Sequence, residues 1–193
     1  MLFWSCGKDS YLAYRKLSEA GVEVTLLTTF DLTTGVIAHQ DLSIQTIVGQ
    51  AKHLGLPLIG VPLHSEQPYE EHIVNGLKLV DAKQLAFGDL HLQHIREWRE
   101  KAFGEDPRTQ DLELVFPIWR VSYDELLKEL SDADVRCTIS AVTLTDSGIV
   151  IGDEFDHLFL ERLPKGVDGF GENGEFHTLI SFREDLEHAG ERI

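Results

Sequence analysis

The 193-residue chain is poor in cysteine and in basic residues, and it has no long apolar run. Its two cysteines, Cys6 and Cys137, are too few for the disulfide framework of a small secreted fold. They also form no Cys-x-x-Cys pair of the kind that binds structural zinc. No apolar stretch is long enough to cross a bilayer. Lys8 and Asp9 interrupt the N-terminus, so we expect no signal peptide, no membrane partner and a cytoplasmic location.

The charge balance is strongly acidic. The chain has 17 Lys and Arg against 33 Asp and Glu, which gives a formal net charge of -16. Proteins that hold RNA or DNA usually present a basic face, so this balance argues against a nucleic-acid partner. An anionic small molecule would need positive charge supplied locally, by a lysine, by backbone amides or by a metal ion.

The order of apolar and amphipathic segments predicts an α/β fold. Strand-like segments are expected at residues 2–4, 23–30, 57–62, 84–88 and 112–116, and helices at 11–20, 43–54, 69–79 and 91–103. Such alternation is typical of βαβ units, so we expect a five-stranded, mainly parallel sheet with helices on both faces. After Pro117 a smaller α/β lobe is expected, with residues 1–118 as the first domain and 119–193 as the second.

The segment Ser5-Cys6-Gly7-Lys8-Asp9-Ser10 joins the first expected strand to the first expected helix. Ligands of open parallel sheets bind at the carboxyl ends of strands, and a helix N-terminus attracts anions. The glycine lets the backbone approach phosphate, the two serines can donate hydrogen bonds, and the lysine adds a charge. Asp9 would repel phosphate, so we expect it to bind Mg²⁺ or to cap the helix.

This loop is not a Walker A motif, because Asp9 separates Lys8 from Ser10 and the upstream glycine is missing. A capped turn that binds nothing is the alternative interpretation. The loop resembles the Ser-Gly-Gly-x-Asp-Ser signature of the PP-loop ATP pyrophosphatases. That resemblance implies ATP as ligand, with its pyrophosphate end at residues 5–10, and transfer of AMP to a substrate oxygen.

Cys6 stands where this family usually has its first glycine, and we expect a Cβ to be tolerated there only at negative φ. A small side chain packed near the backbone is the interpretation that we favour over a redox or sulfur-carrying thiol. We expect adenine to lie near Thr28, Thr29 and Phe30, where backbone groups at the end of a strand can read the base.

Residues 169–174 match Gly-x-Gly-x-x-Gly, but a dinucleotide-binding fingerprint follows a strand and opens a helix. Here Pro164-Lys165-Gly166 precedes the match and a β-prone stretch follows it, so a dinucleotide site is rejected. Taken by itself, the region could be a solvated turn at Asn173-Gly174. However, residues 171–178 resemble the Gly-Glu-x-Gly-Glu-Phe-x-Thr segment of the diphthine–ammonia ligase family, the diphthamide-synthesis branch of the PP-loop enzymes.

Other segments are similar to the same family, in the same order. Phe87-Gly88-Asp89 is similar to its strand end after the fourth βα unit, residues 116–119 to its Pro-Leu-Trp, and residues 50–58 to the exit of its second helix. His39 falls where the family has a histidine after the second strand. The resemblance implies a Rossmann-like, adenine nucleotide alpha hydrolase-like fold, with Gly88 and His39 also at the ATP site.

The resemblance further implies a ligase that adenylates a carboxylate, after which ammonia attacks to give an amide, AMP and pyrophosphate. The candidate catalytic residues are Lys8, Asp9, Asp89, Glu172 and Glu175. The candidate substrate-binding residues are Arg96, Glu172, Asn173, Glu175, His177 and Thr178. Arg96 and Arg99 could instead serve as partners of neighbouring glutamates on their helix.

We expect the active site to lie between the lobes, with Glu172, Asn173, Glu175 and His177 facing the nucleotide and Asp89 at the cleft floor. The acceptor carboxylate would lie on elongation factor 2 in an archaeal or eukaryotic source, and would be a different carboxylate in a bacterial one. One alternative is an ATP- or AMP-binding protein with another acceptor or little turnover. A second is sulfur transfer to tRNA, which the acidic charge disfavours. Whether the chain forms a homodimer stays open.

Overall fold

The computed structural model describes the chain except residues 38–41, 65, 81, 110 and 184–193. Five strands form one sheet in the order β3-β2-β1-β4-β5, and every pair of neighbours is parallel. The strands are β1 (Leu2–Phe3), β2 (Leu26–Asp31), β3 (Leu58–Leu63), β4 (Gln84–Ala86) and β5 (Glu113–Val115). This confirms the expected five-stranded parallel sheet and the Rossmann-like α/β class.

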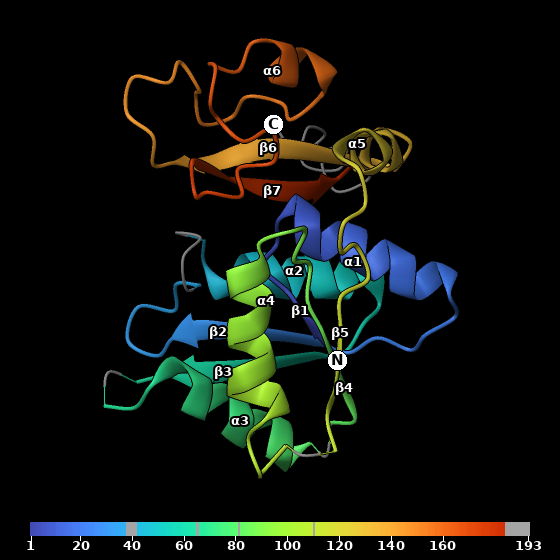
Figure 1. Cartoon of the computed structure of the whole chain (residues 1–193), viewed down its shortest axis with the longest axis vertical. Helices are drawn as coiled ribbons and strands as arrows, with labels where there is room; N and C mark the ends of the chain where they lie inside the picture. Colours follow the sequence, from blue (N-terminus) through green and yellow to red (C-terminus); the bar gives the residue numbers. More distant parts are fainter. Residues whose placement is uncertain (38–41, 65, 81, 110, 184–193) are drawn as a thin grey trace, which may run out of the picture.

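Helices cover both faces of the sheet, and each face has its own core (Figure 1). The first-lobe helices are α1 (Lys8–Glu19), α2 (Ile44–Leu54), α3 (Tyr69–Leu79) and α4 (Gln93–Arg99), the last continued by the π-helical η1 (Glu100–Gly104). α1 and α2 contribute to one core, while α3 and η1 contribute to the other. The expected helix over residues 91–103 is therefore two elements.

Local signals explain the bounds of α2. The Ser43 side chain accepts a hydrogen bond from the Gln45 N–H at the first turn, and Gly55 ends the helix at a φ of 66°. α1 instead begins at Lys8, three residues before the expected start at Tyr11. The connecting loop is correspondingly shorter, and Lys8, Asp9 and Ser10 belong to the first helical turn.

The C-terminal part has a different architecture. It contains α5 (Tyr123–Ser131), β6 (Val135–Val142), α6 (His157–Glu161) and β7 (Phe176–Phe182), and the two strands pair antiparallel. The short α6 lies within residues 148–174, a stretch with many glycines where no helix was expected. In Figure 1 the β6–β7 pair lies over α1 and α2, on the side away from the parallel sheet.

The C-terminal part shares a core with the first lobe. One apolar cluster runs from Leu2 and Trp4 through Tyr11 to Ile180 and Phe182. Alternate residues of β7 are buried, as expected for a strand that covers a core. The division of the chain after residue 118 stays a prediction. None of the described helices is long and apolar enough to span a bilayer.

Candidate functional site at the strand ends

A cavity of about 340 Å³ opens beyond the carboxyl ends of β1, β2 and β4. This volume lies within the usual range of small-molecule sites. The strand order changes direction at β1, and ligands of doubly wound sheets bind at such a point. Eight residues named from the sequence line the cavity together, from segments far apart in the chain: Ser5, Asp9, Ser10, Thr28, Thr29, Gly88, Asp89 and Glu172.

The loop before α1 has an unexpected backbone conformation at Cys6. Cys6 has a φ of 70°, in the left-handed region that glycine prefers, so the expected negative φ is wrong. Its carbonyl accepts a hydrogen bond of 2.9 Å from the Ile180 N–H of β7, which helps to hold this conformation. The side chain is fully buried, and burial raises the pKa of the thiol to about 12. The thiol is therefore neutral near pH 7, which agrees with the interpretation of Cys6 as a packed, unreactive side chain.

The C-terminal part caps helix α1. Gly7 stands at the N-cap without a side chain to accept from the first turn, and the Lys8 N–H donates instead to Thr178 Oγ1 at 3.1 Å. A Cβ on Gly7 would lie 3.1 Å from the Thr178 carbonyl oxygen, tighter than most real contacts. Close approach of β7 is thus one reason for the glycine. Thr178, expected to bind substrate, acts here as a cap.

The Lys8 ammonium points toward the C-terminal part. Nζ donates to the Phe170 carbonyl at 2.6 Å and to Asp9 Oδ2 at 3.0 Å. It also lies 5.1–5.9 Å from the ring centroids of Phe155, Phe170 and Phe176. The structure therefore places this charge against an aromatic cluster, while the sequence predicted it at the phosphates.

Asp9 is a half-buried carboxylate in the first turn of α1. Oδ2 pairs with Lys8, but Oδ1 is buried and has no hydrogen-bond partner. Burial raises the pKa of Asp9, against the opposing effect of the Lys8 charge. Thr28 Oγ1, on another wall of the cavity, is also buried without a partner. Such orphaned oxygens mark a place where a polar ligand or a cation would gain contacts.

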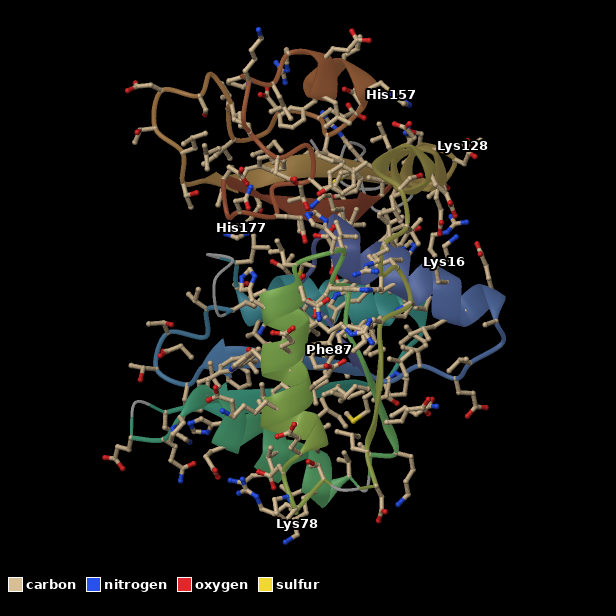
Figure 2. The ribbon with its side chains drawn as sticks, viewed as in Figure 1. Lys16, Lys78, Phe87, Lys128, His157 and His177 are labelled. Atoms are coloured by element: carbon tan, nitrogen blue, oxygen red, sulfur yellow. The ribbon has the colours of Figure 1, made fainter. Side chains whose placement is uncertain are left out.

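Asp89 and Gly88 follow β4. Arg99 holds Asp89 in a two-point ion pair, with Nε 2.5 Å from Oδ2 and Nη2 2.9 Å from Oδ1. The guanidinium also lies 3.9 Å from the centroid of the Phe87 ring, a residue labelled in Figure 2. A Cβ on Gly88 would come within 2.6 Å of the Asp9 carbonyl, so only glycine permits this approach to α1.

Arg99 rather than Arg96 brings a guanidinium to the cavity. Arg96 donates to Glu100 at 2.8 Å and lies over the rings of Phe116 and Trp119. It does not line the cavity, so the structure does not bring it to the other candidate substrate-binding residues. The helical period places residues 96 and 99 on nearby faces, and the sequence alone could not distinguish them.

A second cavity of about 210 Å³ lies between the α1 N-terminus and the loop that precedes β7. Lys8, Glu172, His177 and Thr178 are among its lining residues, and Figure 2 labels His177 on β7. Glu172 lines both cavities. Burial, and then the charge of Asp9, raise the pKa of Glu172 to about 8. Of the expected facing residues, Glu172 and His177 thus reach a cavity.

Glu175 and Asn173 do not face the cavities, contrary to expectation. The Glu175 carboxylate accepts from the N–H groups of Asp168 and Asn173, both at 3.0 Å, and from the Asn173 amide at 3.1 Å. Burial would raise the pKa of Glu175, but these hydrogen bonds together lower it. Asn173 is exposed. The two residues form the turn at the expected Asn-Gly position, where the Glu175 carboxylate accepts hydrogen bonds from several N–H donors at once.

Several residues at the site were missed or misplaced. Tyr69 lines the first cavity, and Tyr123 donates to both oxygens of Asp168 at 3.0 Å, which braces the 168–175 turn. No spacing in the sequence links these residues to the loop at residues 5–10. Phe30, expected near adenine, does not line the cavity; its ring packs over Gly60 instead. His39 lies outside the described residues.

Residues 1–105 match the diphthamide synthase N-terminal domain. The chain belongs to this family. The matched segment includes Ser5–Ser10 and Asp89, and it identifies a domain of the PP-loop, ATP-using type of enzyme. Residues 171–178 lie beyond the match, so their assignment depends on the geometry described above.

A distant structural likeness was also found. The crystal structure of a predicted subunit of a tRNA methyltransferase from Methanocaldococcus jannaschii is 19% identical in sequence, with a TM-score of 0.46. The alignment covers 72% of this chain and 79% of that one. No curated protein matches the chain.

Proposed function

We propose that the chain is an amide-forming ligase that binds ATP in the 340 Å³ cavity and splits it between the α- and β-phosphates. The observation that carries the proposal is the position of the N-terminus of α1, which lies within the segment that matches the diphthamide synthase N-terminal domain. Its first turn opens on the cavity and carries a buried carboxylate oxygen without a partner. Backbone N–H groups at such a terminus favour phosphate.

The residues present fit a magnesium ion. Among the described residues, no group of three or more metal-ligand side chains gathers into a complete site. Mg²⁺ usually needs only one or two carboxylates, because water and substrate phosphates complete its shell. Asp9 would hold it through the unpartnered Oδ1. The ion would supply charge neutralisation for the phosphates, because the walls of the cavity carry no excess of positive charge.

The adenine end would lie toward Thr28, Thr29 and Tyr69, where the cavity is lined by β2 and α3. The acceptor carboxylate would enter on the side of Glu172, which lines both cavities. With its raised pKa, Glu172 can hold a proton near neutral pH and exchange it with an incoming amine. Ammonia would then displace AMP from the activated carboxylate. Diphthine on elongation factor 2 is the acceptor expected in an archaeal or eukaryotic source.

One observation favours a second candidate, a nucleotide-binding protein with little turnover. The Lys8 ammonium donates hydrogen bonds to Phe170 and Asp9, and the Lys8 backbone N–H donates to Thr178. Productive phosphate binding would have to compete with these contacts.

Product analysis tests the proposal. The purified chain is incubated with ATP, Mg²⁺, ammonium and a panel of carboxylates that includes diphthine-bearing elongation factor 2. AMP and pyrophosphate in equal amounts support the ligase, while ADP and phosphate contradict it. Asp9→Ala should weaken Mg·ATP binding measured by calorimetry, and Asp111→Ala, at an exposed site, is the matched control. Tight binding without AMP release would favour the second candidate.

A further inference from the structure

Gln50 is a buried polar side chain of α2, with 5% of its surface exposed. Its Oε1 accepts a hydrogen bond of 2.7 Å from the indole Nε1 of Trp4. Its Nε2 donates to the carbonyl of Ile180 at 2.6 Å and makes a longer contact of 3.4 Å with the carbonyl of Cys6. An indole N–H can only donate, so the orientation of the Gln50 amide is fixed. One side chain thus links the end of β1, the loop at residues 5–10 and β7.

The same peptide of the loop receives a second tie from β7. Cys6 O accepts from the Ile180 N–H at 2.9 Å, so Gln50 and Ile180 converge on one carbonyl. Cys6 has a φ of 70°. A residue with a Cβ keeps that conformation only where its surroundings over-determine it. Here the surroundings are these two donors and the burial of the side chain.

We propose that Gln50 is a positioning residue of the nucleotide site. Gln50 fixes β7 against Cys6 and so keeps the backbone of Cys6 in the left-handed conformation. The shape of the loop at residues 5–10 then depends on how the C-terminal part packs on the first lobe. Gln50 lines neither cavity and acts only through the loop. The effect on nucleotide affinity rests on the proposed function, whereas the effect on the loop does not.

The test compares Gln50→Leu with Gln45→Leu, at an exposed position of the same helix. Mg·ATP binding is measured by calorimetry on each. Gln50→Leu should bind about tenfold more weakly, as expected when a strained backbone is no longer held in place. Gln45→Leu should bind as the wild type does. Wild-type affinity in Gln50→Leu would overturn the proposal.

A second substitution separates positioning from general loss of structure. Glycine adopts a φ near 70° without strain, so Cys6→Gly in the Gln50→Leu background should recover most of the lost affinity. Cys6→Gly alone completes the double-mutant cycle. Equal affinities of the single Gln50→Leu variant and the double variant would show that the conformation of Cys6 is not what Gln50 controls, and would overturn the proposal.

Hydrogen exchange without nucleotide keeps this proposal independent of ATP. In Gln50→Leu the Ile180 amide, which donates to Cys6, should exchange faster, while Gln45→Leu should leave it unchanged. If the wild type fails to bind ATP, the proposed function falls and this exchange result still decides the role of Gln50. If Gln50→Leu does not fold, Gln50→Glu takes its place. That variant keeps an acceptor for Trp4 but turns an oxygen toward two carbonyls, so it should also speed the exchange, and an unchanged rate would overturn the proposal.

Discussion

Gly88→Ala tests the contact between the end of β4 and the first turn of α1. An added Cβ would lie 2.6 Å from the carbonyl carbon and oxygen of Asp9 and 2.9 Å from the Ser10 nitrogen. These are backbone atoms, and the turn that holds them is further fixed by Thr178 and by the Ser10 hydroxyl bonded to Gly7. Neither partner can yield as a flexible side chain would. Overpacking of this kind costs typically about 1–3 kcal/mol.

The midpoint of thermal unfolding measures this cost. For a chain of this size, each kcal/mol lowers the midpoint by roughly 2–4 °C, so we expect a fall of about 2–12 °C. Gly49→Ala is the matched control, because it lies within α2 and an added Cβ there has nothing within 4 Å. Alanine is favoured over glycine inside helices by roughly 0.5–1 kcal/mol, so the control should be more stable than the wild type.

The two alanine variants should therefore move the unfolding midpoint in opposite directions. Gly88→Ala should also weaken Mg·ATP binding, because the displaced turn carries Asp9. A Gly88→Ala protein with wild-type stability would show that the two segments do not approach as the structure describes, and the reasoning would fail.

Two further predictions concern the 168–175 turn. Glu175→Gln turns an N–H₂ toward donors that now share a carboxylate, and should lower the free energy of unfolding by about 1–3 kcal/mol in denaturant titrations. Glu161→Gln, at an exposed position of α6, should change the free energy of unfolding little. Equal effects of the two substitutions would show that the Glu175 carboxylate does not stabilise the turn. The pKa of Glu172 is raised from 4.5 to about 8 in the folded protein, so the folded state holds the Glu172 proton more tightly than the unfolded state does. The free energy of unfolding should therefore fall as the pH rises from about 4.5 to 8. Glu172→Gln should flatten this part of the pH profile, and an unchanged slope would argue against the raised pKa.

The parallel sheet was predictable because each of its signals is local. β2 and β3 are apolar segments next to amphipathic helices, and Ser43 and Gly55 mark the ends of α2 with residues that suit those positions. The start of α1 was placed late because its cap, Thr178, lies 170 residues away in sequence. The short α6 was missed because its five residues lie among glycines and are too few to show a periodic pattern.

The site was predictable where a motif carries the chemistry and not where packing decides. The loop at residues 5–10 and Gly88 reach one cavity, as their place at strand ends suggested. The sequence predicted the same role for Glu172 and Glu175, because both are glutamates in one polar stretch. Only the tertiary structure shows that one carboxylate satisfies the turn. Arg99 and Tyr69 gain their places from the packing of α3 and α4, which no spacing encodes.

The charges around the main cavity bear on the proposed anion site in a protein that is acidic overall. Asp89 is neutralised by Arg99 in a two-point ion pair, and Asp9 is balanced on one oxygen by Lys8. Glu172, with its pKa raised to about 8, is largely protonated at pH 7. The walls are thus close to neutral without any excess of positive charge. In the proposed function, the attraction for phosphate would come from the dipole at the N-terminus of α1 and from a magnesium ion on the unpartnered oxygen of Asp9. Both act on the first turn of α1, the element that Gly88, Thr178 and Gln50 hold in position directly or through the loop.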